Sequence, residues 1–161
     1  MEGRSNEKPA EVKVDVDVNA FLPDDYVVSA SERVDIYRRL IEARDAETIA
    51  ELKTEIEDRF GPTPQPAQNL FDYLMLKHHA LSAGLSLVTV RKGRMSGRFA
   101  RESVPDGERF KTWLGYIIER SSGHDKFNLR QEGDDLEFEL TFAKGEPVLE
   151  GAKKFLHRIS E

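Results

Sequence analysis

The chain has 161 residues, of which 39% are hydrophobic and 34% are charged, with a formal net charge of -6 at pH 7. This length suits one domain around a single hydrophobic core, and the acidic balance argues against a dedicated duplex-DNA binder, which usually carries a basic excess. Because the chain contains no cysteine, disulfides, thiolate zinc sites and cysteine nucleophiles are excluded.

The first ten residues are polar and include Gly3 and Pro9, which predicts a linker over 1–10 that enters a single domain over 11–161 from an upstream region. No apolar run approaches the roughly 20 residues that a membrane span requires, and the N-terminus lacks the apolar core of a signal peptide. We therefore expect no membrane association and a cytoplasmic location.

Patterns in the first half of the chain predict one strand followed by three helices. Valine alternates with charged residues over 12–18, which is typical of a strand with one buried face. A capping box that begins at Ser29 predicts a helix over about 30–44. The side chains of this helix that we expect inside are Val34, Tyr37, Leu40 and Ile41. Asp45 can cap a second helix that ends at Gly61, and a third helical stripe follows a proline-rich connector.

The second half of the chain predicts two hairpins and two further helices. Short strands are expected over 85–90 and about 95–99, and a helix begins near Asp106. The side chains of this helix that we expect inside are Phe110, Trp113, Leu114, Ile117 and Ile118. A second hairpin turns at Gly133 before the last helix. Strands and helices in this mixed order predict an α+β domain, with a small, mainly antiparallel sheet packed with about five helices.

Signatures of enzyme chemistry are absent from the sequence. It has no GxxxxGK(S/T) phosphate loop, no GxGxxG after a strand and no GxSxG elbow. His78 and His79 are adjacent and cannot share the i, i+4 geometry of a helical zinc site. Asp24 and Asp25 follow a proline, where carboxylates more often serve a turn than an acid/base pair. We therefore expect no catalytic residue, no metal site and no cofactor in this chain.

Four carboxylates fall on one face of the helix that Asp45 begins. They stand at steps of four, four and three residues: Glu47, Glu51, Glu55 and Asp58. Like charges at this spacing destabilise a helix by roughly 0.2–0.5 kcal/mol per pair, and the expected pairs Glu55 with Arg59 and Lys53 with Glu57 offset only part of this cost. The face is either a solvated surface or a docking surface for a basic partner.

Basic residues gather around the first predicted hairpin without an acidic residue among them. They are Arg91, Lys92, Arg94, Arg98 and Arg101. Such residues often protect an exposed sheet edge from pairing with another chain. Alternatively, the hairpin 91–101 is a nucleic-acid-binding module whose side chains contact phosphate, although it lacks the interleaved aromatic residues of single-strand binders.

Three segments in the first half of the chain resemble a known family. They are VNAFLPDDYV at 18–27, RVDIYRRL at 33–40 and ELKTEIEDRFGP at 51–62. Their order and spacing are similar to those of the C-terminal domain of the bacterial transcription-repair coupling factor. From about Leu85 onward, only the coarse order of strands and helices matches.

The resemblance implies a role within a much larger protein. The family is a DNA translocase, a helicase-type hydrolase driven by ATP and Mg, which displaces RNA polymerase stalled at a DNA lesion and recruits UvrA for nucleotide excision repair. Its motor motifs lie upstream of this domain, so the fragment itself is expected not to be an enzyme. In the family, the C-terminal domain packs against the N-terminal UvrA-binding module of the same protein and acts as an autoinhibitory clamp.

The resemblance also implies where this contact lies. Glu55, Asp58 and Arg59 match the E-x-x-D-R positions of the family, which form a polar docking surface toward the UvrA-binding module. Glu51 and Glu47 extend the same face by helical geometry rather than by the resemblance. If the alternative holds, nucleic acid would instead contact Arg91, Lys92, Arg94 and Arg98.

Overall fold

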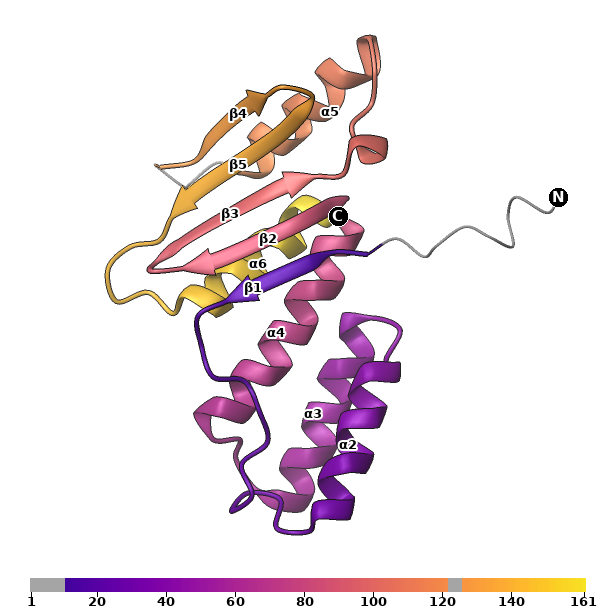
Figure 1. Ribbon diagram of the computed structural model, residues 1–161, viewed down its shortest axis with the longest axis vertical. Helices are drawn as coiled ribbons and strands as arrows, with labels where there is room; N and C mark the ends of the chain where they lie inside the picture. Colours follow the sequence, from indigo (N-terminus) through magenta and orange to yellow (C-terminus); the bar gives the residue numbers. More distant parts are fainter. Residues whose placement is uncertain (1–10, 122–125) are drawn as a thin grey trace, which may run out of the picture.

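The structure, a computed structural model, describes residues 11–121 and 126–161 (Figure 1). The linker predicted over 1–10 lies outside the described residues. The strands are β1 (Lys13–Val16), β2 (Leu85–Arg91), β3 (Arg94–Phe99), β4 (Asn128–Glu132) and β5 (Asp135–Thr141). The helices are α2 (Ala30–Glu42), α3 (Ala46–Phe60), α4 (Gln65–Ser82), α5 (Glu108–Arg120) and α6 (Val148–Ser160), with a 3-10 turn η1 (Arg101–Ser103).

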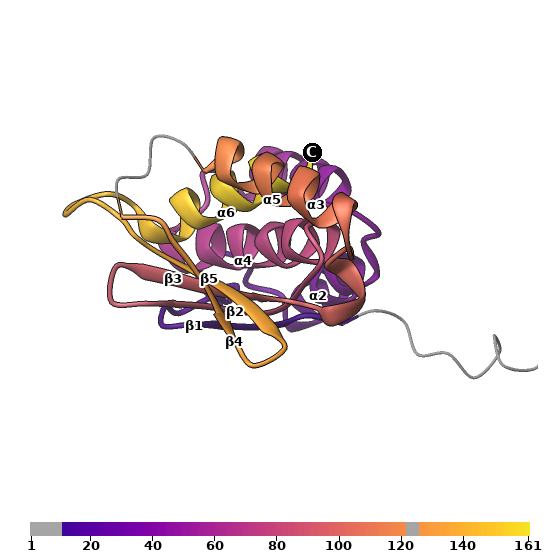
Figure 2. The ribbon, with the colours of Figure 1, turned by 90° about the horizontal axis from the view of Figure 1, so that it is seen from above.

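The five strands form one sheet in the order β1-β2-β3-β5-β4. β1 runs parallel to β2, and the other neighbours are antiparallel. Helices α4, α5 and α6 lie on one side of this sheet, and none of the described helices covers the opposite side (Figure 2). This arrangement confirms the predicted α+β class and its mainly antiparallel sheet. Within the described ranges, no helix combines the length and the apolar character that a membrane span requires.

The first strand is shorter than the range 12–18 that the valine alternation predicts. Val12 is buried, but Val18 is 40% exposed and lies beyond the last paired residue. β2 turns back at Lys92 and Gly93, which both have positive φ, as a two-residue hairpin turn requires. No strand backbone therefore remains beside Val18 to extend the ladder.

The buried side chains form two clusters, whereas the chain length alone predicts a single core. One cluster lies between the sheet and helices α4, α5 and α6, and it includes Leu76 and Ala80 of α4. The other joins α2, α3 and the segment around Leu22 to the first half of α4, including Leu70 and Phe71. Helix α4 therefore belongs to both cores, and it connects the sheet to the α2–α3 hairpin (Figure 1).

Three apolar side chains expected inside are exposed instead. On α2, Ile36 and Leu40 are buried, whereas Val34 is 68% and Ile41 is 78% exposed. On α5, Ile117 is the buried residue of the expected stripe, and Ile118 is 53% exposed. Each helix buries a narrower stripe than its apolar residues predict, because it packs at the rim of a core rather than between two layers.

Candidate docking surface

The α2–α3 hairpin extends from the sheet, and its two helices begin at the residues that the sequence predicts (Figure 1). The hydroxyl of Ser29 accepts a hydrogen bond from the backbone N–H of Glu32, at 3.3 Å. The carboxylate of Asp45 accepts from the backbone N–H of Thr48, at 2.8 Å. Gly61, with φ 90°, ends α3. These local contacts fix the length of α3 and therefore the positions of its carboxylates.

Glu55, one of the predicted docking residues, is held by α2. Arg39 donates two hydrogen bonds to its carboxylate, from Nη1 to Oε2 at 2.5 Å and from Nη2 to Oε1 at 3.0 Å. This donation holds the pKa of the Glu55 carboxyl below its usual range. Arg39 was missed as a functional residue, because nothing in the order of residues shows that it faces α3.

Arg59 also turns toward α2 rather than along its own helix. Its Nη2 lies 3.5 Å from Oε1 of Glu32, and its guanidinium lies 4.8 Å from the centre of the Phe60 ring. The charge of Arg59 acts on the Glu55 carboxyl, after that of Arg39, to lower its pKa, but the ion pairs of both residues join α3 to α2. Lys53 and Glu57, in contrast, form the expected pair at 3.3 Å.

The other three carboxylates of the predicted face are open. Glu47, Glu51 and Asp58 are exposed, and none of them forms an ion pair within residues 11–121 and 126–161. We call these three residues the open carboxylates. They follow the outer side of α3, where Glu47 and Glu51 stand at the i, i+4 spacing at which like charges destabilise a helix, while Glu55, between Glu51 and Asp58, is offset by Arg39.

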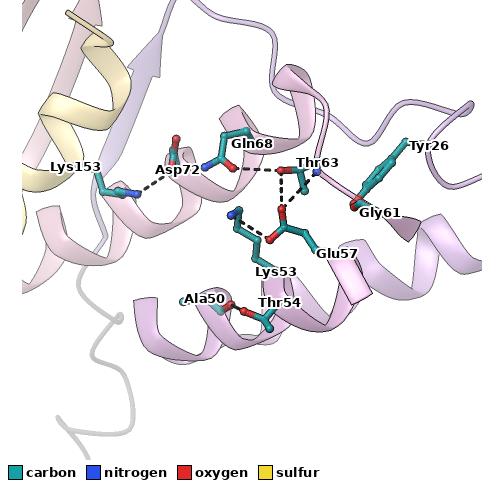
Figure 3. Close-up of polar contacts among 10 residues, drawn as sticks. All are labelled: Tyr26, Ala50, Lys53, Thr54, Glu57, Gly61, Thr63, Gln68, Asp72 and Lys153. Carbon is teal, nitrogen blue, oxygen red and sulfur yellow. Dashed lines mark hydrogen bonds and ion pairs between the residues drawn. The ribbon is translucent and has the colours of Figure 1, made fainter. Parts of the chain in front are cut away.

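A buried ion pair joins the sheet half of the domain to α4. Nζ of Lys153, on α6, donates to Oδ1 of Asp72, on α4, at 2.8 Å (Figure 3). The side chain of Asp72 is only 7% exposed and that of Lys153 is 21% exposed. Gln68, one turn before Asp72, donates a further hydrogen bond to the same oxygen at 3.1 Å. Two donors therefore satisfy a carboxylate that would be costly to bury alone.

This polar chain continues from α4 into α3. The hydroxyl of Thr63 lies 3.3 Å from Oε1 of Gln68 and 3.2 Å from Oε2 of Glu57 (Figure 3). It has one proton, so it donates a hydrogen bond to one of these oxygens at a time. Glu57 is partly desolvated, yet hydrogen bonds from Lys53 and Thr63 hold the pKa of its carboxyl below the usual range. These polar contacts hold the side of α3 that faces α4, and the ion pairs with Arg39 and Glu32 hold the side that faces α2.

The segment FLPDDYVV at 21–28 supports the C-terminal end of α3. The carbonyl of Pro23 accepts hydrogen bonds from the backbone N–H groups of Tyr26 and Val27, which form the expected turn. The phenol of Tyr26 donates to the carbonyl of Gly61 at 2.7 Å. Asp24 and Asp25 are exposed in this turn. The segment is the corner that the sequence predicts, and in the structure it also supports the end of α3.

Two of the four basic residues predicted to contact nucleic acid, and the neighbouring Arg101, are paired within the domain. Arg91 binds Asp15 at 2.8 Å, Arg98 binds Glu137 at 2.8 Å and Arg101 binds Asp135 at 3.1 Å. These acids come from other strands, so the sequence of the hairpin does not show them. Among the described residues, Lys92 and Arg94 are the members of the group that have no ion pair.

The adjacent histidines lie apart from the docking residues. His79 packs against His157 of α6, with ring centres 4.7 Å apart. Burial is the main cause that lowers the pKa of His79 to about 4, and electrostatic interactions with His157 and Lys153 lower it further. In the described part of the chain, no three histidine, aspartate or glutamate side chains gather as metal ligands.

The fold and the acidic helical hairpin define a small α+β domain, and comparisons with known proteins identify its family. The family model described as "TRCF domain" matches residues 16–110, which is more than half of the chain. The chain therefore belongs to the TRCF domain family.

Curated relatives agree with this assignment. The chain is 33% identical over 78 residues to "Transcription-repair-coupling factor" of Staphylococcus aureus (strain USA300), covering 48% of this chain and 7% of that protein. It is 32% identical over 108 residues to the protein of the same name from Mycobacterium bovis, covering 67% of this chain and 9% of that protein. The matched segments thus span less than a tenth of the length of these relatives.

A solved structure shares the fold along nearly the whole chain. The structure titled "Crystal structure of C-terminal domain of transcription-repair coupling factor" superposes with a TM-score of 0.74 and covers 94% of both chains. The two sequences are 16% identical, so this likeness concerns the fold. It extends to the sheet and helices after Leu85, where the sequence resemblance is coarse.

Proposed function

We propose that this domain is a regulatory docking domain of a transcription-repair coupling factor. It holds the parent protein closed by binding the N-terminal UvrA-binding module of the same protein through α3. In this closed form UvrA has no access to its binding site. Engagement of stalled RNA polymerase and DNA by the ATP-driven parent then releases the clamp, which needs only a few kcal/mol of competing contact energy.

The open carboxylates are the observation that carries this proposal. Glu47, Glu51 and Asp58 lie exposed on a helix whose other sides are fixed by α2 and by the polar chain from α4. An unbalanced row of carboxylates costs the isolated helix stability, and a basic partner surface would offset that cost. A rigid support also means that binding orders few groups, which limits the entropy lost on docking.

We assign two roles to the predicted docking residues. Glu55 and Arg59 are occupied by Arg39 and Glu32, so they hold α3 in place and supply only part of their charge to a partner. Glu51 and Asp58 are free to form new ion pairs. We therefore assign the charge recognition of the partner mainly to the open carboxylates.

A double charge reversal on α3 tests the proposal. Glu51→Lys with Asp58→Lys should weaken binding of the domain to the separated N-terminal module by at least about tenfold, which corresponds to about 1.4 kcal/mol. In the full-length protein, the same variant should bind UvrA without stalled polymerase. Isothermal titration calorimetry measures the first effect, and a UvrA pull-down measures the second.

The control reverses two exposed carboxylates elsewhere and changes the net charge by the same amount. Glu119, on α5, and Asp134, in the turn between β4 and β5, are exposed and far from α3 in the sequence. Glu119→Lys with Asp134→Lys should bind the module as the unmodified domain does. Unchanged UvrA binding in the full-length α3 variant would refute the docking role.

The nucleic-acid alternative has a separate test. If the domain binds a DNA duplex through the hairpin 91–101, Lys92→Glu with Arg94→Glu should lower the affinity and reduce its dependence on salt. We expect the unmodified domain to show only weak binding in fluorescence anisotropy, because three of the five basic side chains already have acidic partners. Tight, salt-dependent binding that this variant abolishes would favour the alternative.

A further inference from the structure

The last turn of α3 carries a carboxylate where a helix tolerates it least. Asp58 is exposed and stands in the final turn of the helix, which ends at Phe60. The free carbonyl groups of this turn give the end of the helix a partial negative charge, so the carboxylate is repelled and the turn tends to fray. Contacts from outside the helix therefore have to hold the turn that presents Asp58.

Tyr26, in the corner segment 21–28, supplies the first of these contacts. Its phenol donates to the carbonyl of Gly61 at 2.7 Å, and its ring meets the ring of Phe60 edge to face, with centroids 6.0 Å apart. Burial raises the pKa of the phenol, and the negative charge of Glu57 raises it further. The hydroxyl therefore keeps its proton at neutral pH and remains a donor to the end of α3.

Thr63, in the connector between α3 and α4, supplies the second contact. Its backbone N–H and its hydroxyl both reach Oε2 of Glu57, at 3.4 and 3.2 Å. Hydrogen bonds to a carboxylate are stronger than those to a neutral amide, so the hydroxyl proton favours Glu57 over Gln68. Figure 3 shows Thr63 beside Glu57 and Tyr26 beside Gly61. Two segments outside the helix thus hold its last turn.

The two residues next to Asp58 are both held. Successive residues of an α-helix are about 100° apart around the axis, so Glu57 and Arg59 flank Asp58 on opposite sides. Thr63 holds Glu57. Arg59 contacts Glu32 of α2 and lies over the ring of Phe60, which is the ring that Tyr26 meets. Rotation of the last turn is therefore limited from both sides, and the direction of the Asp58 side chain is limited with it.

We propose that Tyr26 and Thr63 are positioning residues for docking, which hold the last turn of α3 so that the carboxylate of Asp58 faces the basic partner. Neither residue needs to touch the partner. A carboxylate on a fixed turn loses less conformational freedom on binding than one on a frayed turn, so affinity is gained without a new contact. This inference rests on the proposed function, because the partner is the N-terminal module that binds α3.

Removing single hydroxyl groups tests this inference. Tyr26→Phe keeps the ring against Phe60 and removes only the donor to Gly61. It should weaken binding to the separated N-terminal module by about three- to tenfold in calorimetry, as expected for the loss of one hydrogen bond that holds the turn. Thr63→Val should give a loss of similar size, whereas Thr63→Ser keeps the hydroxyl and should restore binding to within about twofold. Thermal melts should show that each variant is folded at the temperature of the titration.

A double-mutant cycle distinguishes positioning from a general loss of stability. If Tyr26 acts through Asp58, Tyr26→Phe should change the affinity by less than about twofold once Asp58→Asn has removed the charge that it positions. An equal loss in both backgrounds would refute the positioning role. In the full-length protein, Tyr26→Phe should increase UvrA binding in the absence of stalled polymerase, which a UvrA pull-down measures.

The matched controls remove the same groups elsewhere. Tyr116, on α5, also donates its phenol to a backbone carbonyl at a helix end, that of Glu161 after α6. Thr112 is exposed on the same helix α5. Tyr116→Phe and Thr112→Val should each change the affinity by less than about twofold, because neither residue supports α3. A loss in these controls comparable to that of Tyr26→Phe would overturn the inference.

The outcomes separate the inference from the proposed function. If Glu51→Lys with Asp58→Lys weakens binding while Tyr26→Phe and Thr63→Val bind normally, the proposed function stands and the positioning role is refuted. If the unmodified domain does not bind the module at all, the proposed function fails and the inference fails with it. A loss in Tyr26→Phe that disappears in the Asp58→Asn background supports both.

Discussion

Arg39 of α2 and Glu55 of α3 form a two-pronged ion pair across the hairpin, with N···O distances of 2.5 and 3.0 Å. The side chains are 34% and 46% exposed, so the pair is partly screened by water. A contact between two exposed ends of long side chains stabilises a fold modestly, but this one is bidentate, with each Nη of the guanidinium bonded to a different carboxylate oxygen. Its main effect is to fix α3 relative to α2.

A double-mutant cycle measures this contact. Arg39→Ala and Glu55→Ala should each lower the free energy of unfolding, and the coupling between them should be about 0.5–1 kcal/mol. Urea denaturation of the two single variants and the double variant gives the value. A coupling near zero would show that other contacts position α3.

The Lys153–Asp72 pair should contribute more, because it is largely buried. Asp72→Asn leaves an ammonium without its carboxylate and should lower the free energy of unfolding by about 2–3 kcal/mol in urea denaturation. This value lies near the low end for buried pairs, since Lys153 keeps 21% exposure and can reach water. Asp72→Leu with Lys153→Met removes both charges and should recover much of the loss.

His79 should make stability fall at mildly acidic pH. Its pKa is about 4 in the folded chain, while an unfolded histidine titrates near 6.5. Between these values the unfolded chain binds a proton that the folded chain does not, so the free energy of unfolding decreases as the pH falls through this window. His157, Lys153 and His78 surround the ring and oppose its protonation.

The difference between the parent domain and His79→Gln isolates this effect. Protonation of carboxylates such as Glu55 and Glu137, whose pKa values are lowered by arginine, also destabilises the fold in acid. Both proteins contain these carboxylates, so their contribution cancels in the difference. Thermal melts from pH 7 to pH 4 should show a flatter profile for His79→Gln. Parallel profiles would contradict the low pKa.

Two glycines should respond to alanine in opposite ways. Gly97 of β3 pairs with Phe138 of β5, and a methyl group at Gly97 would collide with that ring. Gly97→Ala should therefore lower the free energy of unfolding by about 1–3 kcal/mol. Gly115 lies inside α5 with open space around its Cα, so Gly115→Ala should raise stability by about 0.5–1 kcal/mol. Thermal melts of the two variants check both signs.

The sequence predicts best those features that depend on neighbouring residues. The caps at Ser29 and Asp45, the end of α3 at Gly61 and the hairpin turns are local, and the structure contains all of them. The α+β class follows from the order of the periodic patterns. The exposed carboxylates of α3 follow from helical geometry alone.

Contacts between distant segments could not be predicted in this way. Arg91 finds Asp15 because β1 pairs with β2, and that pairing crosses 76 positions of the chain. The sequence of the hairpin alone therefore predicts a basic patch, although acidic side chains of other strands compensate much of its charge. The apolar residues of α2 illustrate a related limit, because a helix at the rim of a core can bury Ile36 and leave Val34 in water.

Helix α4 contributes side chains to both hydrophobic clusters, Phe71 to one and Leu76 to the other. Neither cluster can lose its packing without exposing part of the same helix, so melting of the α2–α3 hairpin should destabilise the sheet as well. The domain should therefore unfold in one cooperative transition. A force that pulls on the docked hairpin would pass through α4 to the sheet, and the domain would respond as one stiff body rather than as two parts joined by a hinge.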